Sequence, residues 1–229
     1  MSIANQLLIL SQTKNNIKES INLKGVEVTD EAFAEYPDKI RQIPNGGGWY
    51  ESNVILFLEG KLKNLVVPSG TTTIRDFAYS GNSLMETLTI PSSVQSIGKN
   101  AFCCNWRLSS VTIDNGVTTI GERAFSVCER LNSIVFPDSV TTIGDDCLYM
   151  SSVSYVEFGT GIRTLGKRII TIYNAVLNFR STTPPTKDSS SFPSSSELTI
   201  YVPDSSVLDY QVAWTEYANN IKPVSQMPS

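Results

Sequence analysis

Short runs of alternating apolar and polar residues recur along the chain at nearly constant spacing. Each run ends on an apolar residue and has a second apolar residue two positions before it, which is the period of a strand with one buried face. The terminal residues are separated by 23, 23, 23, 22, 21 and 21 positions: Val67, Ile90, Ile113, Phe136, Phe158, Phe179 and Ile200. Their partners two positions earlier are Leu65, Leu88, Val111, Ile134, Val156, Leu177 and Leu198. The pattern predicts one short strand in each repeat.

A second apolar position follows five of these strands, seven residues after the end of each. These positions are Ile74, Ile97, Ile120, Ile143 and Leu165, and a glycine follows all but the first: Gly98, Gly121, Gly144 and Gly166. A glycine there indicates either a tight turn with positive φ or a close approach between two backbones. Small and large apolar residues then stand side by side, as in Ala101-Phe102 and Ala124-Phe125. They predict a short helical turn against the core.

A small polar or sulfur-containing residue lies eight positions after this second apolar residue in four successive repeats. These residues are Asn82, Asn105, Cys128 and Ser151. Side chains of this kind can satisfy backbone groups that the fold would otherwise bury without a partner. We expect them to form a rung-like series of hydrogen bonds between adjacent repeats.

One repeat is too small to fold alone. About six apolar side chains contribute roughly 1.5–3 kcal/mol each when buried, whereas ordering the backbone costs about 1–2 kcal/mol per residue. Repeats stacked along one axis cover one another and share a core, so that stability belongs to the array. The strands would then lie parallel, about 4.8 Å apart, with Ile97, Ile120 and Ile143 in one row.

The repeated pattern L-x-I-P-x-x-V-x-x-I-G-x-x-A-F-x-x-C/N-x-x-L resembles the BspA-type leucine-rich repeat. It is clearest in "LTIPSSVQSIGKNAFCCNWRLSSVTI" (88–113) and "VTTIGERAFSVCERLNSIVFPDSVTTIG" (117–144). The resemblance implies a leucine-rich-repeat solenoid that is mainly β, with a parallel strand ladder on its concave side and short helical turns. The repeat domain is expected to cover residues 49–224.

Both ends of the repeat domain carry sequences that suit caps. Residues 49–67 are interpreted as a hairpin that turns near Glu59-Gly60, and residues 198–224 as a closing strand and helix. Five residues of this second cap are expected to cover the last repeat: Leu208, Val212, Trp214, Tyr217 and Ile221. Residues 180–197 are rich in serine and proline and are expected to form a loop.

The first 44 residues predict a separate helical segment, joined to the repeats by a glycine-rich linker at 45–48. One narrow apolar stripe consists of Ile3, Leu7, Leu10, Ile17 and Ile21, and a second short helix carries Phe33, Tyr36 and Ile40. Helices of this size cannot bury such stripes alone, so the segment needs a partner surface. The repeat array, copies of the same segment and another protein are the alternatives.

Residues 10–43, "LSQTKNNIKESINLKGVEVTDEAFAEYPDKIRQI", are similar to N-terminal segments of tail and appendage proteins of gut bacteriophages. The resemblance implies that residues 1–44 anchor the protein to other virion proteins or to copies of itself. The N-terminus shows no pattern of a secretory signal peptide, and no stretch approaches the roughly 20 apolar residues of a membrane span. The expected location is therefore the virion, and the alternative is a bacterial cell surface.

The composition removes several classes of chemistry. The chain has no histidine, which excludes Ser-His-Asp and Cys-His catalysis and the HExxH metal site. The net charge of −4 comes without a clustered basic face, so nucleic acid is not an expected partner. Cys103, Cys104, Cys128 and Cys147 are expected to be free thiols with no metal or cofactor. The adjacent Asp145 and Asp146 are interpreted as a solvated turn.

These observations together predict a non-enzymatic structural protein of a bacteriophage virion, such as a tail, fibre or other appendage. Its repeat domain would bind another protein or a host-surface protein or glycan, and the alternative is a bacterial cell-surface adhesin of the BspA type. A glycan-cleaving enzyme is a third and weaker hypothesis. The candidate binding residues are the outward strand positions Thr89, Thr112, Val135, Glu157 and Asn178, with Tyr155 and Tyr201 nearby. The alternative for these positions is a solvated strand face without a ligand.

Overall fold

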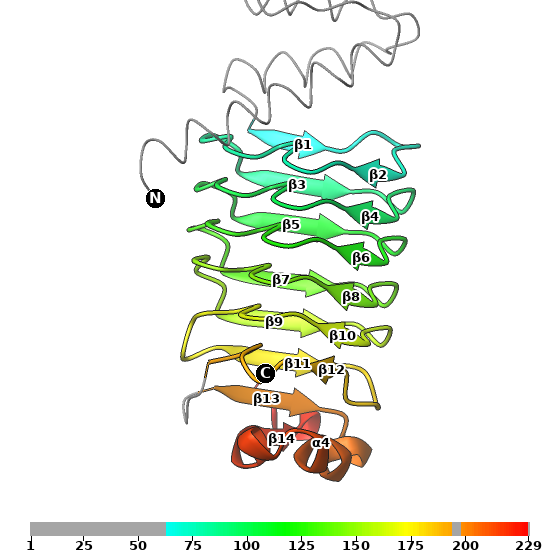
Figure 1. Ribbon diagram of the computed structural model, residues 1–229, viewed down its shortest axis with the longest axis vertical. Helices are drawn as coiled ribbons and strands as arrows, with labels where there is room; N and C mark the ends of the chain where they lie inside the picture. The colour runs from blue at the N-terminus through cyan, green and yellow to red at the C-terminus, as the bar shows by residue number, and fades with distance from the viewer. Residues whose placement is uncertain (1–62, 194–197, 229) are drawn as a thin grey trace, which may run out of the picture.

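The computed structural model describes residues 63–193 and 198–228, which form a stack of parallel strands closed at one end by helical turns (Figure 1). The expected helical segment at 1–44, the linker at 45–48 and the first arm of the hairpin at 49–67 lie outside the described residues. The apolar stripe from Ile3 to Ile21 and the second apolar set, Phe33, Tyr36 and Ile40, belong to that segment and therefore also lie outside the described residues. Where the described chain begins, the second arm of that hairpin is a strand that pairs parallel with the next repeat.

The longer strands of successive repeats make a first ladder. Its members are β1 (Asn64–Val66), β3 (Thr87–Ile90), β5 (Ser110–Ile113), β7 (Ser133–Phe136), β9 (Tyr155–Phe158), β11 (Val176–Phe179), β13 (Thr199–Val202) and β14 (Ile221–Pro223). Hydrogen-bonded pairs run from β1 through β3 to β5, and from β7 through β9, β11 and β13 to β14. All of these pairs are parallel, which confirms the predicted strand ladder.

A second ladder lies beside the first and was not predicted. It is a continuous six-stranded sheet of very short strands. They are β2 (Thr73–Ile74), β4 (Ser96–Ile97), β6 (Thr119–Ile120), β8 (Thr142–Ile143), β10 (Thr164–Leu165) and β12 (Thr186–Lys187). Ile97, Ile120 and Ile143 are paired in register, which confirms the expected row. The strand β12 falls inside the segment 180–197 that was expected to be only a loop, so that expectation is wrong there.

The core between the ladders is organised in rows of like side chains. The stacked rings of Tyr79, Phe102 and Phe125 have centroids 5.5 and 5.4 Å apart. A second aromatic row continues towards the C-terminus, where the rings of Phe158 and Phe179 stack at 4.3 Å. Offset aromatic pairs of this kind contribute about 0.5–1.5 kcal/mol beyond the burial of their area. The repeat therefore specifies both which residues are buried and which neighbours they meet.

Glycine follows the second ladder because two backbones approach closely there. A Cβ atom built on Gly121 would lie 2.7 Å from the carbonyl carbon of Gly98, and one on Gly144 would lie 2.7 Å from the amide nitrogen of Glu122. Neither glycine has positive φ. Of the two explanations that the sequence left open, close approach is therefore the correct one.

In four repeats two positions instead adopt the left-handed conformation, mostly without glycine, and in a fifth repeat one position does. One set has φ between 44° and 59°: Phe77, Asn100, Arg123, Asp146 and Arg168. Four positions later the second set has φ between 56° and 79°: Gly81, Cys104, Val127 and Met150. The segment between the two sets directs alternate N–H groups to the next repeat, as Asn100, Phe102 and Cys104 do. These hydrogen bonds offset a conformation that costs about 1–2 kcal/mol for each non-glycine residue.

The expected polar rung is confirmed. The Asn105 Oδ1 atom accepts a hydrogen bond from the Asn82 amide at 2.9 Å. Its Nδ2 atom donates to the carbonyls of Tyr79 at 3.0 Å and Phe102 at 2.8 Å. Ser151 repeats the arrangement further along the stack, accepting from the Cys128 amide at 2.9 Å. The side chains of Asn105 and Ser151 thus join adjacent repeats through backbone groups outside the strand ladders.

The last repeat corrects two expectations. The sequence spacing aligned Phe179 with Ile200, but the structure pairs Leu177 with Ile200 and Asn178 with Tyr201, so the final spacing is 23 residues rather than 21. The cap contains η2 (Asp204–Ser206), α4 (Val207–Ala213), η3 (Thr215–Asn220) and η4 (Val224–Gln226). Figure 1 shows α4 closing the end of the stack beyond β13.

Aromatic residues and Ile221, which is buried as expected, cover this end. Leu208 and Val212 are 74% and 77% exposed, so their assignment to the cap interface was wrong. Tyr210 is buried and donates its hydroxyl hydrogen to the Ser181 carbonyl at 3.0 Å. Trp214 and Tyr217 are buried as expected, and their Nε1–H and hydroxyl donate to the carbonyls of Pro185 and Phe192, respectively. An aromatic ring with a polar tip can fill the core and satisfy a loop carbonyl at the same time.

Candidate functional site

The outward side chains of the first ladder form two parallel columns, which we call the first-ladder face. One column contains Asn64, Thr87, Ser110, Ser133, Tyr155, Val176 and Thr199. The other contains Val66, Thr89, Thr112, Val135, Glu157, Asn178, Tyr201 and Lys222. All seven candidate binding residues, from Thr89 to Tyr201, therefore lie in these two adjacent columns.

The face is open and made of small side chains along its first four strands. Thr112 and Val135 are exposed, and Thr89 is half-buried. The neighbouring column adds the exposed hydroxyls of Thr87 and Ser110. Because each side chain stands on a hydrogen-bonded strand, the surface is held rigidly at the spacing of the repeats.

Further along, the face changes into a polar cluster centred on Glu157. Its Oε2 atom accepts hydrogen bonds from the Tyr155 hydroxyl at 3.0 Å and from Asn178 Nδ2 at 3.4 Å. Its Oε1 atom lies 3.2 Å from Arg180 Nη1. The other terminal nitrogen of Arg180 binds both carboxylate oxygens of Asp138 at 2.6 Å. Side chains of three successive repeats thereby fix one another, and one guanidinium neutralises two carboxylates in part.

Two pKa shifts follow from this arrangement. Burial raises the pKa of the Tyr155 hydroxyl, and the neighbouring Glu157 carboxylate raises it further. The pKa of Asp138 is lowered, first by a hydrogen bond from the Thr160 backbone N–H and then by Arg180. Tyr155 is consequently a neutral donor and Asp138 an ionised acceptor at neutral pH.

Asn178 and Tyr201 are placed differently from the other candidates. Each is only 6% exposed, so neither presents much surface to a partner. The Asn178 Oδ1 atom is buried and has no hydrogen-bond partner within the described part of the chain. The accessible part of the candidate face therefore lies on Thr89, Thr112 and Val135, with Tyr155 and Glu157 at its edge; contact of any of these residues with a ligand stays a prediction.

The second ladder carries its own outward column, which the sequence analysis missed. Its members all bear hydroxyl groups and are paired in register: Thr73, Ser96, Thr119, Thr142, Thr164 and Thr186. The signal was present in the sequence, because most of them directly precede the second apolar position. It was overlooked because two-residue strands leave no alternation to detect.

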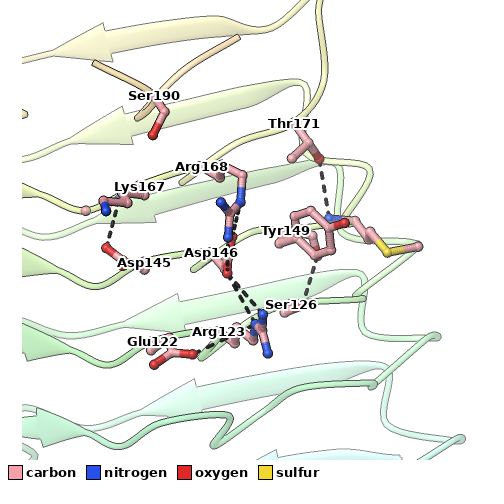
Figure 2. Close-up of polar contacts among 12 residues, drawn as sticks. Glu122, Arg123, Ser126, Asp145, Asp146, Tyr149, Lys167, Arg168, Thr171 and Ser190 are labelled. Atoms are coloured by element: carbon pink, nitrogen blue, oxygen red, sulfur yellow. Dashed lines mark hydrogen bonds and ion pairs between the residues drawn. The ribbon is translucent and has the colours of Figure 1, made fainter. Parts of the chain in front are cut away.

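Asp146 is the most buried charged group near these faces. Figure 2 shows its carboxylate between the guanidinium groups of the preceding and following repeats. Arg168 Nε lies 2.8 Å from Oδ1, and Arg123 Nη2 lies 3.2 Å from Oδ2. The Asp146 side chain is 4% exposed, so the interpretation of Asp145-Asp146 as a solvated turn is wrong for the second residue. Asp145 is exposed and accepts a hydrogen bond from the Lys167 amide at 2.8 Å.

The described residues hold no grouped metal ligands, and two of the four cysteines lie in the main core. No group of three or more histidine, cysteine, aspartate or glutamate residues could hold a metal ion within 63–193 and 198–228. Cys128 and Cys147 are fully buried in the main core, and burial raises the pKa of Cys147 to about 12. Across the same ranges, no helix has the length and apolar character needed to cross a bilayer.

Comparison with known proteins gives one match to a protein family. The model of the BspA type leucine rich repeat region matches residues 54–174 in six copies. No curated protein sequence matches the chain.

Several solved structures resemble the fold. The pneumococcal vaccine antigen PcpA is 17% identical over 71% of this chain, with a TM-score of 0.56. A leucine rich cell surface protein from Faecalibacterium prausnitzii is 24% identical over 45% of this chain, with a TM-score of 0.42. A leucine-rich repeat protein from Bacteroides capillosus is 27% identical over 42% of this chain and is covered over 76% of its own length, with a TM-score of 0.39. The present chain spans 40% of the length of PcpA and 27% of that of the Faecalibacterium protein.

Proposed function

This chain belongs to the BspA type leucine rich repeat family, and from that premise we propose that it is a non-enzymatic protein that binds a protein or glycan surface through its first-ladder face. The observation that carries the proposal is the open set of small outward side chains over the first four strands. Threonine, serine and valine lose little side-chain entropy when a partner covers them, and the paired backbone beneath them is already ordered.

The polar cluster supports the same use of the face. Tyr155 and Arg180 belong to the residue types that are enriched at binding hot spots. Glu157 and Asp138 are both engaged with Arg180, so this end of the face has a fixed geometry before a partner arrives. A preorganised surface spends less of its binding energy on ordering side chains.

We further propose that the protein is a component of a bacteriophage virion, such as a tail, fibre or other appendage. Its support is the similarity of residues 10–43 to N-terminal segments of phage tail and appendage proteins. In this proposal residues 1–44 attach to other virion proteins or to further copies, and the repeat domain faces outward. The second candidate is an adhesin on the bacterial cell surface, which the repeat family favours.

Location separates the two candidates. Phage particles induced from the source strain and purified by density would be analysed by mass spectrometry, in parallel with protease-treated intact cells. Recovery of the chain in the particles supports the virion component. Recovery only as protease-sensitive material on intact cells overturns it in favour of the adhesin. In the full chain, Leu7→Lys with Leu10→Lys should prevent incorporation into particles.

The binding face is tested by substitutions on the two ladders. Fluorescently labelled full chain would be incubated with intact cells of the bacterium that the phage infects. Replacing both Thr112 and Val135 by arginine should weaken retention by about tenfold or more, equivalent to at least about 1.4 kcal/mol. The matched control is Thr119→Arg, an exposed hydroxyl of the second ladder. Equal retention of the double variant and the control would show that this face does not bind the cells.

A further inference from the structure

Cys103 and Cys104 lie together in a small apolar cluster apart from the main core. The cluster contains these two cysteines and Val127, and Trp106 packs against it. Both cysteines are only 2% exposed. They occupy a corner where the chain turns back towards the next strand of the first ladder.

The backbone at this corner brings the two sulfur atoms together. Successive side chains of an extended chain point in opposite directions, but Cys104 has a φ of 63°, which bends the chain. The Sγ atoms of Cys103 and Cys104 are consequently 3.0 Å apart. A disulfide bond is about 2.05 Å long, so a movement of about 1 Å would join them.

Neighbouring repeats hold this corner on both sides. The Cys103 carbonyl accepts hydrogen bonds from the Gly81 amide at 2.8 Å and from the Ser80 hydroxyl at 3.0 Å. The Cys104 amide donates to the Ser126 carbonyl at 2.9 Å. The position of the sulfur pair is therefore a property of the folded array, and an unfolded chain would not keep it.

The two thiols differ in acidity in a way that suits a reactive pair. The hydrogen bond between them raises the pKa of Cys103, with burial adding to the effect, and lowers the pKa of Cys104. Of the two thiols, Cys104 therefore has the lower pKa and more readily becomes a thiolate. The thiolate is the form that attacks disulfides. Burial is the main cause that raises the pKa of Cys128 and of Cys147.

We propose that Cys103 and Cys104 form a redox-active vicinal dithiol that small disulfides oxidise to an internal disulfide. The Cys104 thiolate attacks one sulfur of a disulfide R–S–S–R, forming a mixed disulfide and releasing R–S⁻. Cys103 then loses its proton to solvent and its sulfur attacks Cys104 Sγ, which breaks the mixed disulfide and releases the second R–S⁻. Two thiols are oxidised to one disulfide while R–S–S–R is reduced to two thiols.

The experiment uses the full native chain and oxidised glutathione. After incubation the chain is unfolded, alkylated with iodoacetamide and digested with trypsin. Cleavage after Lys99 and Arg107 yields the peptide 100–107, which contains both vicinal cysteines and Trp106, whereas Cys128 lies in the separate peptide 124–130. We expect the peptide 100–107 to lose the mass of two hydrogen atoms and to escape alkylation. Cys128 and Cys147 should remain fully alkylated.

Trp106 provides a second readout on the intact protein. A disulfide beside an indole ring quenches its fluorescence, so emission should fall on oxidation and recover when dithiothreitol is added. Cys103→Ser should trap one glutathione on Cys104, because the resolving thiol is gone. Cys147→Ala should leave the vicinal reaction unchanged.

Three results would overturn the proposal. One is native protein that carries a stable glutathione adduct with no internal disulfide. Another is a disulfide that maps to Cys128 or Cys147. The last is an equal yield of the vicinal disulfide from protein that is kept unfolded in urea throughout oxidation, because the folded corner would then contribute nothing.

Discussion

Replacing Asn105 by alanine removes the most highly connected side chain of the polar rung. Asn105 is fully buried and makes three hydrogen bonds to backbone groups of the same and the preceding repeat. Alanine fits the space but leaves the Asn82 amide and the carbonyls of Tyr79 and Phe102 without this partner. A buried polar group that loses its partner costs about 1–3 kcal/mol. Three such groups give an expected loss of about 3–9 kcal/mol in the free energy of unfolding.

Replacing Asn105 by serine should give a smaller loss of stability than alanine, because serine already occupies the equivalent position in another repeat of this protein. Ser151, the equivalent residue two repeats later, accepts from the Cys128 amide at 2.9 Å and donates to the Phe125 carbonyl at 2.7 Å. Asn105→Ser should therefore keep two of the three hydrogen bonds. Its expected cost is about 1–3 kcal/mol.

Urea denaturation followed by circular dichroism and tryptophan fluorescence measures these losses. Asn132→Ala, on an exposed side chain, serves as the control and should stay within about 0.5 kcal/mol of the wild type. Total stabilities of small domains are about 5–15 kcal/mol, so the alanine variant should show a large shift of the midpoint. If the alanine and serine variants unfold together, or if alanine costs less than about 1 kcal/mol, the rung does not stabilise the stack as argued.

Further substitutions test other features of the array. Gly121→Ala would place a methyl group against the backbone of the preceding repeat, and the midpoint of urea unfolding should fall by the equivalent of about 1–3 kcal/mol. Met150→Gly should raise the thermal midpoint, by the equivalent of about 0.5–1 kcal/mol, because glycine tolerates the left-handed φ of 56° at a position that Gly81 occupies in an earlier repeat. The pKa of Asp138 is lower in the folded state than in the unfolded state, chiefly through the hydrogen bond from Thr160, so its contribution is present above the unfolded pKa and is lost as pH falls through the folded pKa. The urea midpoint should therefore fall less steeply on acidification in Asp138→Asn than in the wild type.

The repeated pattern predicted the main architecture because one periodicity determines several levels of structure at once. The strand residues, the row from Ile97 to Ile143 and the polar rung with Asn105 all recur at the same spacing, so they must stack on their own copies. The second ladder was not recognised from the sequence, because strands of two residues are too short to show an alternation of apolar and polar residues.

The C-terminal end was predicted less well because the repeat stops there. The sequence spacing aligned Ile200 with Phe179, whereas in the structure Ile200 pairs with Leu177 and the strand β13 continues to Val202. The helix α4 was expected to bury Leu208 and Val212, but its aromatic side proved to be the buried one. Helical spacing allows either face of a seven-residue helix to turn inward, and the hydrogen bonds of Tyr210 and Trp214 to loop carbonyls, which favour the observed face, cannot be read from that spacing.

The candidate face was predicted in position but not in accessibility. Strand alternation correctly placed Thr112, Glu157 and Asn178 on the outward side of the ladder. The same alternation could not show that Arg180 would reach back to Asp138, two repeats earlier, or that Asn178 would be nearly covered. Such contacts depend on the lengths of side chains in neighbouring repeats, which a pattern of apolar and polar letters does not contain.

The constant register of the second ladder means that whole repeats can be gained or lost by recombination within the gene. Ser96, Thr119 and Thr142 pair in register, and each lies 23 residues from the next. Excising one such unit, for example 117–139, would bring together two surfaces that are already complementary, and inserting one would do the same. Unequal recombination can thus lengthen or shorten the stack in steps of one repeat, and only contacts specific to the lost unit, such as the ion pair of Arg123 with Asp146, would disappear with it.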